Sequence, residues 1–121
     1  MGKTILAVDD NQDFLELVTL MLEGAGYQVQ RARHAMAALE LLEQSLPDAI
    51  LLDIMMPMRN GLEFLENLRW DNRFDKIPVI ILTAMNLEEE EQEFVDEFAL
   101  ACLSKTEITD LTGHLQRLLP D

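Results

Sequence analysis

Five short runs of apolar residues, each of strand length, alternate along the chain with longer segments of helical periodicity. Four of the runs are almost unbroken, which is typical of strands buried on both faces of a sheet. The remaining run alternates only weakly between polar and apolar residues, which is typical of an edge strand. The pattern predicts strands at residues 4–8, 27–32, 49–52, 79–82 and 100–103.

The segments between these runs carry apolar residues at helical spacing and end at recognisable stop signals. Asn11 is a candidate cap for the first helix, and Gly24-Ala25-Gly26 ends it. Pro47 ends the second helix. Helices are predicted from residue 14 to the stop at 24–26, and over residues 35–46, 61–70, 88–98 and 108–119.

The element order is a strand followed by a helix, repeated five times. Alternation of this kind predicts a parallel sheet with right-handed crossovers and helices on both faces. The polar strand at residues 27–32 belongs at an edge, which favours the strand order 2-1-3-4-5. We therefore expect a doubly wound, flavodoxin-like three-layer α/β sandwich that forms a single domain over residues 1–121.

Charge and composition narrow the choice of partners. The 121 residues carry a formal net charge of −14, which argues against direct binding of nucleic acid or of an anionic membrane surface. This negative net charge is compatible with binding of divalent cations and of partners with basic patches. No apolar run approaches the roughly 18 residues of a membrane helix, and none resembles a signal peptide, so we expect a cytoplasmic protein. The single cysteine, Cys102, excludes an internal disulfide and a thiolate metal cage.

Polar side chains with matching chemistry follow four of the five predicted strands. Asp9 and Asp10 follow the first, Asp53 the third, Thr83 the fourth and Lys105 the fifth. Parallel strands bring these ends to one edge of the sheet, with Asp10 and Asp53 on neighbouring strands about 5 Å apart. In isolation each residue has an ordinary explanation, such as a helix cap, a loop acid, a strand-end threonine or a surface lysine. Their coincidence at strand ends favours a common site.

The chemistry of this group indicates phosphoryl transfer. Three close carboxylates repel one another, and a hard cation such as Mg²⁺ relieves the repulsion while keeping several waters. With the metal and the Lys105 ammonium neutralising phosphoryl oxygens, the Asp53 carboxylate can act as a nucleophile and become an aspartyl phosphate. The Thr83 hydroxyl can donate to one phosphoryl oxygen.

The arrangement resembles the receiver domains of bacterial two-component response regulators. The motifs are Asp9-Asp10, the run Asp53-x-x-Met56-Pro57-x-x-x-Gly61, Thr83-Ala84 and Lys105, and the resemblance covers the whole chain. It implies that Asp53 receives a phosphoryl group from a histidine kinase or phosphotransfer protein. It also implies that the domain catalyses only its own phosphorylation and dephosphorylation, so it is not otherwise an enzyme.

The resemblance further assigns the ligands and the signalling surface. Asp10 and Asp53 would bind Mg²⁺ with the main-chain carbonyl of Met55, and Asp9 would help through water. Thr83 and Lys105 would contact the phosphoryl oxygens. In this family, phosphorylation shifts the population toward an active form that differs at the face formed by the fourth helix, the fifth strand and the last helix. A downstream protein partner would bind through this face. The sequence leaves open the cognate kinase, a homodimer, and whether the chain is a stand-alone protein.

Three positions depart from the family pattern, and all lie on the route from the site to this face. Cys102 stands where the family has its switch aromatic, Thr106 replaces the proline after the lysine, and Phe98 stands where a glycine is common. The phosphorylation chemistry is therefore expected to be intact, whereas the usual threonine-to-aromatic relay is in doubt. Phe98 is either a substitute moving ring or a core contact of the fourth helix.

Two further features carry hypotheses. Met55 and Met85 lie two residues after Asp53 and Thr83. In the family, the side chains at these positions flank the phosphoryl group and influence the rate of its hydrolysis. Neither methionine offers a polar group to position water. We expect a long-lived phosphoaspartate. The fourth helix is rich in glutamate, which is either a solvated face or a docking surface for a basic partner. Arg69, Arg73 and Lys76 are expected to be solvated at the opposite pole.

Other functional classes fit less well. An aspartate-nucleophile phosphohydrolase needs an acid two residues after its nucleophile, where this chain has Met55. A flavodoxin-like cofactor binder needs an anion-binding loop after the first strand, where Asp9 and Asp10 would repel phosphate. A receiver-like scaffold that works without phosphorylation stays open because of the altered fifth strand.

Overall fold

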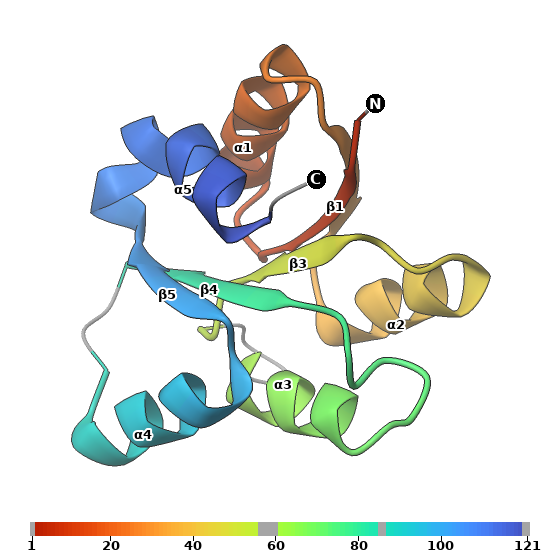
Figure 1. Cartoon of the computed structure of the whole chain (residues 1–121), viewed down its shortest axis with the longest axis vertical. Coiled ribbons are helices and arrows are strands. Elements are labelled where there is room, and N and C mark those ends of the chain that lie inside the picture. The colour runs from red at the N-terminus through yellow and green to blue at the C-terminus, as the bar shows by residue number, and fades with distance from the viewer. Residues whose placement is uncertain (1, 56–60, 85–86, 120–121) are drawn as a thin grey trace.

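A parallel sheet of five strands runs through the middle of the computed structural model, which describes residues 2–55, 61–84 and 87–119 (Figure 1). The strand order is β2-β1-β3-β4-β5, which confirms the predicted topology and the edge position of the polar strand. The strands are β1 (Thr4–Val8), β2 (Gln28–Ala32), β3 (Ala49–Leu52), β4 (Val79–Thr83) and β5 (Ala101–Ser104).

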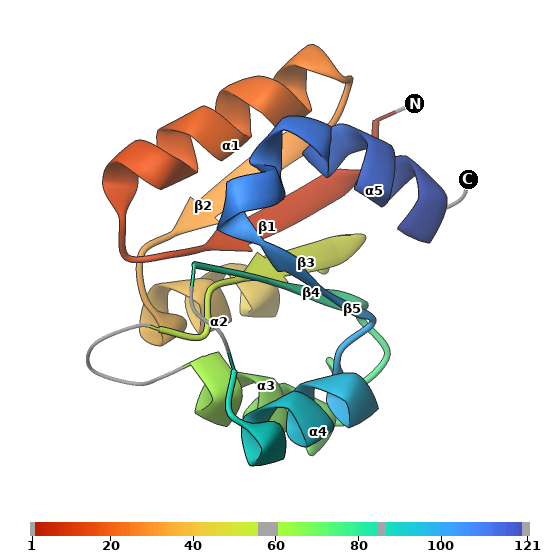
Figure 2. The ribbon, with the colours of Figure 1, turned by 90° about the vertical axis from the view of Figure 1, so that its left-hand side faces the viewer.

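Helices cover both faces of this sheet, which confirms the three-layer sandwich. In Figure 2, α1 (Gln12–Gly24) and α5 (Leu111–Leu118) lie above the sheet. The helices α2 (Ala35–Gln44), α3 (Gly61–Arg69) and α4 (Glu89–Phe98) lie below it.

The strand side chains alternate between two hydrophobic cores, one on each face. In β3, Ile50 and Leu52 belong to the core beneath α2, α3 and α4, while Ala49 and Leu51 belong to the core beneath α1 and α5. All four are almost completely buried. Burying one large aliphatic side chain stabilises a fold by about 1.5–3 kcal/mol, so the two cores fix the sheet and the positions of its strand ends.

Some predicted boundaries were wrong, and each error has a local cause. The fifth strand begins at Ala101, which pairs with Ile80, although the amide of the 49% exposed Leu100 already donates to Val79 O at 2.8 Å. The second helix ends at Gln44 because Ser45 is already extended, two residues before Pro47. The last helix is preceded by a 3₁₀ helix, η1 (Lys105–Asp110), which begins where the amide of Thr106 donates to Ser104 Oγ at 3.2 Å.

Arg69 was wrongly expected to be a solvated surface residue. Its guanidinium donates from Nε to the carbonyl oxygen of Phe98 at 2.8 Å, and from its two terminal nitrogens to Asp75 O and Ile77 O, both at 2.9 Å. Partial burial lowers the pKa of Arg69, and the carboxylate of Asp75 opposes that shift. The side chain therefore ties the end of α3 to the end of α4 and to the turn before β4.

Arg69→Lys is expected to lower the free energy of unfolding by about 2 kcal/mol, because an ammonium group cannot satisfy three carbonyls arranged for a planar guanidinium. Urea denaturation measures the loss. Arg73→Lys is the matched control, since Arg73 pairs with Asp71 at the exposed surface, and its loss should be much smaller. Equal losses in the two variants would contradict the assigned role of Arg69.

Candidate functional site

The ends of β1 and β3 lie level with each other, and this register sets the position of two acids. Val8 pairs with Leu52 in the parallel ladder, so the next residue of each strand is Asp9 or Asp53. Their main chains stay attached to the sheet, because Asp9 N donates to Ala32 O at 3.1 Å and Asp53 N donates to Val8 O at 3.0 Å. The two carboxylates are thus fixed at one edge of the sheet.

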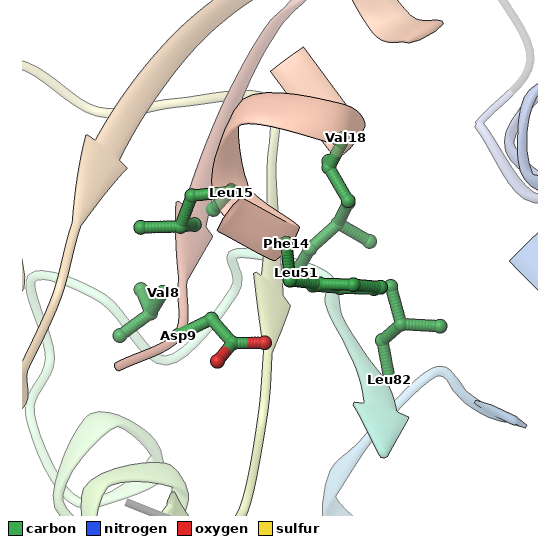
Figure 3. Close-up of a pocket in the computed structure, with 8 residues that line it drawn as sticks. Val8, Asp9, Phe14, Leu15, Val18, Leu51 and Leu82 are labelled. Atoms are coloured by element: carbon green, nitrogen blue, oxygen red, sulfur yellow. The ribbon is translucent and has the colours of Figure 1, made fainter. Parts of the chain in front are cut away.

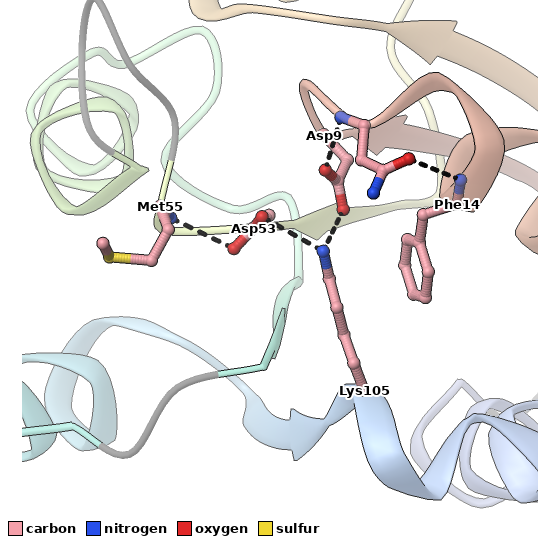
Figure 4. A network of polar contacts seen from close by, with 6 residues as sticks. Asp9, Phe14, Asp53, Met55 and Lys105 are labelled. Carbon is pink, nitrogen blue, oxygen red and sulfur yellow. Dashed lines mark hydrogen bonds and ion pairs between the residues drawn. The ribbon is translucent and has the colours of Figure 1, made fainter.

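Lys105 reaches both of these carboxylates from the end of β5 (Figure 4). Its Nζ lies 2.6 Å from Asp9 Oδ2 and 3.2 Å from Asp53 Oδ2. The sequence predicted Lys105 at this edge but not that its shorter ion pair is with Asp9. The ammonium holds the two acids together from one side.

Backbone amides orient the remaining carboxylate oxygens. Asp9 Oδ1 accepts from the amide of Asn11 at 2.9 Å, and Asp53 Oδ1 accepts from the amide of Met55 at 3.0 Å. Asn11 also caps α1, as predicted, by accepting from the amide of Phe14 at 3.1 Å. Each acid therefore has one oxygen bound to its own loop and the other facing Lys105.

The site is electrostatically loaded because its charges are buried. Burial raises the pKa of Asp9, opposed by Lys105 and the Asn11 amide and supported by the charge of Asp53. Between its ordinary and its raised pKa, Asp9 keeps a proton in the folded protein but releases it in the unfolded chain. The free energy of unfolding therefore falls as pH rises through this window. Burial lowers the pKa of Lys105, but Asp9 and Asp53 more than compensate, so its pKa is raised and the ammonium persists at neutral pH.

Three carboxylates at this edge suit a hard divalent cation. Asp9, Asp10 and Asp53 each offer an oxygen, and these atoms lie within 4.8 Å of one another. Asp9 and Asp53 are only 3% and 6% exposed, whereas Asp10 is more accessible. Oxygen donors of this kind, with an open side for water, match the preference of Mg²⁺.

Two other side chains complete the walls of the site. Thr83, predicted at this edge, ends β4 and is 3% exposed. Phe14 was identified only as an apolar helix position, yet its ring centroid lies 4.2 Å from Lys105 Nζ, so the ring stabilises the ammonium. Figure 3 shows Phe14 beside Asp9 in a small, mainly apolar pocket, with Leu51 and Leu82 from neighbouring strands. The sequence could have indicated that Phe14 lies near the site, because the Asn11 cap places it in the first helical turn after β1.

Gly61 allows α3 to start against the strand that carries Asp53. Its amide donates to Ile54 O at 2.8 Å. A Cβ at this position would overlap the Cα of Ile54 and approach the carbonyl oxygen of Asp53 to 2.5 Å. The glycine of the motif is therefore required by close backbone approach. Met56, Pro57 and Met85, which the sequence also implicated, lie outside the described residues.

Two of the residues that depart from the family pattern, Cys102 and Phe98, make core contacts. Cys102 in β5 is half-buried and packs against the core beneath α4, and burial, with the nearby Asp96, raises the pKa of its thiol. It behaves as a small core residue. Phe98 packs against Phe94, with ring centroids 4.8 Å apart, which supports a core contact of α4.

Comparisons with known proteins agree with this geometry. The family model described as the response regulator receiver domain matches residues 5–116. The polar-differentiation response regulator DivK of Brucella anthropi is 34% identical over 105 residues, covering 87% of this chain and 85% of DivK.

Solved structures show the same fold along almost the whole chain. The chemotaxis response regulator CheY4 of Vibrio cholerae is 31% identical, with a TM-score of 0.87 over 98% of this chain and 100% of that one. A putative response regulator from Chloroflexus aurantiacus is 29% identical, with a TM-score of 0.89 and full coverage of both chains. Among the described residues, no helix is long and apolar enough to span a membrane.

Lys105→Met is expected to tighten Mg²⁺ binding by roughly threefold to tenfold, because the ammonium repels a cation and occupies the oxygens that the cation needs. Isothermal titration calorimetry measures the affinity. Lys76→Met removes an equal charge from the exposed turn before β4 and should change the affinity by less than about twofold. Weaker binding to Lys105→Met would instead show that Lys105 preorganises the acids for the metal.

Proposed function

This chain belongs to the response regulator receiver domain family, and we propose that it is a phosphorylation switch in which Asp53 accepts the phosphoryl group. The observation that carries the proposal is the buried Asp53 carboxylate, 3.2 Å from Lys105 and grouped with Asp9 and Asp10. The donor would be a histidine kinase or phosphotransfer protein of a two-component system.

The two oxygens of Asp53 have different surroundings, which suits a nucleophile. Oδ1 is held by the amide of Met55, and Oδ2 faces Lys105. In the proposed transfer, a carboxylate oxygen forms the new bond to phosphorus while the bond from phosphorus to the donor imidazole breaks. The imidazole keeps the electron pair of that bond. The product is an aspartyl phosphate.

The acids of the site would hold Mg²⁺. Asp10 and Asp53 would be direct ligands, the carbonyl of Met55 a third, and Asp9 would act through water. Bound Mg²⁺ supplies positive charge against the phosphoryl oxygens. Asp9 would then give up part of its ion pair with Lys105, which would free the ammonium for the incoming group.

Lys105 and Thr83 would stabilise the transferred group. The Lys105 ammonium already lies beside Asp53, so a phosphoryl group there can accept a charge-assisted hydrogen bond from it. The hydroxyl of Thr83, buried at the end of β4, would donate to another oxygen. These two contacts would be stronger in the phosphorylated state than before it, which is the condition for a population shift.

The signal would pass to a downstream protein through α4, β5 and α5. Half-buried Cys102 cannot act as a swinging ring, so Thr83 would be linked to this face by a route other than the family's aromatic. We propose one receiver domain over residues 1–121 that acts in the cytoplasm by protein contact, without binding nucleic acid itself.

Acetyl phosphate with Mg²⁺ is expected to add one phosphoryl group to the chain, seen by intact mass spectrometry, because Asp53 is the activated carboxylate. Asp53→Asn should add none, whereas Asp75→Asn, at an exposed position, should behave as wild type. Failure of the wild type would favour the phosphorylation-independent scaffold. Continuous turnover of phosphate esters would favour the phosphohydrolase.

The phosphoaspartate is expected to be long-lived, because the Met55 side chain offers no group to orient water. Met55→Asn should shorten its half-life by at least roughly threefold, through a polar group that can position the attacking water. Phosphate release measures the rate. Met36→Asn is the control, since Met36 is similarly exposed but lies on α2. Identical half-lives in wild type and Met55→Asn would refute the hypothesis.

A further inference from the structure

A groove separates α3 from α4 on the face of the sheet opposite α1 and α5. It is an open hollow with a volume of about 290 Å³. Both helices begin at the edge of the sheet that carries the site, and the groove residues lie in their first two turns. The groove is lined by Leu62, Glu63 and Glu66 from α3, and by Glu90, Glu91 and Phe94 from α4.

The apolar part of the groove is well supported from below. Leu62 and Phe94 are half-buried and pack against the core beneath them. The ring of Phe94 is also stacked at a tilt against Phe98. Arg69 holds the far end of α4 to α3 through its bond to Phe98 O, which limits how far the two helices can separate. Leu62 and Phe94 therefore form a supported apolar part of the groove.

Carboxylates form the walls of this groove. Among the described residues, no lysine or arginine lines it. Glu91 is partly engaged, since its Oε1 accepts from the amide of Glu88 in the capping box of α4. Glu66 and Glu90 make no side-chain hydrogen bond or ion pair with any described residue. The walls therefore present negative charge to an occupant.

The pattern of charge excludes several kinds of occupant. Phosphates, nucleic acids and anionic membranes would be repelled. The glutamates also do not converge on a cation, because within the described ranges only Asp9, Asp10 and Asp53 bring three acidic ligand atoms together. A volume near 290 Å³ is at the lower limit of small-molecule sites and holds one or two large side chains.

We propose that this groove is a docking site for a basic amphipathic helix of a partner protein. Large apolar side chains of that helix would enter between Leu62 and Phe94, and flanking lysine or arginine residues would pair with Glu66 and Glu90. This is the helix-in-groove mode, with anchors at i, i+3 or i+4. The groove lies on the α3 side of α4. It therefore shares α4, but not β5 or α5, with the surface through which the switch is proposed to signal.

The test uses three labelled peptides of about four helical turns each. One has a leucine stripe on a lysine-rich helix, one has the same composition in scrambled order, and one has glutamate in place of lysine. Fluorescence anisotropy should show saturable binding of the first, at least roughly fivefold weaker binding of the second, and none of the third. Amide shifts in ¹H–¹⁵N spectra should change around Leu62, Glu66, Glu90 and Phe94.

Charge reversal separates the groove from general attraction to an acidic protein. The double substitution Glu66→Lys, Glu90→Lys should weaken binding of the peptide with the leucine stripe by at least about tenfold. Glu93→Lys with Glu97→Lys makes the same charge change on α4 outside the groove and should weaken binding by less than about threefold.

Equal weakening by the two pairs, equal binding of the scrambled peptide, a footprint elsewhere or no saturable binding would each overturn the proposal. Binding is measured on the unmodified protein, so it is independent of whether Asp53 accepts a phosphoryl group. The circular dichroism spectrum of the Glu66→Lys, Glu90→Lys variant should match that of the wild type, which shows that its fold is intact.

Discussion

Two carboxylates that repel each other are held side by side at the ends of neighbouring strands, and Lys105 makes their proximity tolerable. The ladder pairs Val8 with Leu52, and this register fixes Asp9 and Asp53 next to each other. The cost of burying Asp9 appears in its raised pKa. The ammonium, 2.6 Å and 3.2 Å from the two acids, is the described cation that offsets this cost. Such an arrangement is primed for an additional positive charge and for an anionic group placed beside Lys105.

The surrounding fold keeps this loaded site in place from several directions. Gly61 lets α3 begin in contact with the backbone of Asp53, and Phe14 provides an aromatic face for Lys105. At the opposite end of the sheet, Arg69 binds three carbonyl oxygens and joins α3 to α4. A helix anchored at its C-terminal end can rearrange most readily at its N-terminal end. For α4 that is the end that follows Thr83 and borders the groove, so the site and the groove lie at the same end of this helix.

The large negative charge of the chain serves two different physical purposes. At the strand ends a few acids are buried, paired and directed inward, where their interactions are strong. On α3 and α4 the glutamates are largely exposed, where solvent and salt weaken each interaction and only a set of charges next to an apolar slot can select a partner. Acids in the first turn of α4 also stabilise that helix through its dipole, so the same residues support the fold and shape the groove.

The sequence alone determined the alternation of strands and helices, the sheet order and the edge position of Asp9, Asp10, Asp53, Thr83 and Lys105. These follow from local periodicity, turn residues and the rule that parallel strands present their ends together. The tertiary structure decided the rest: the shorter ion pair of Lys105 with Asp9, the ring of Phe14 beneath it, the three carbonyls bound by Arg69, and the groove between α3 and α4. Each of these depends on atoms brought together from distant parts of the chain. Hydrophobic pattern specifies which face of an element is buried, but it does not specify which side chain of a neighbouring element will meet it there.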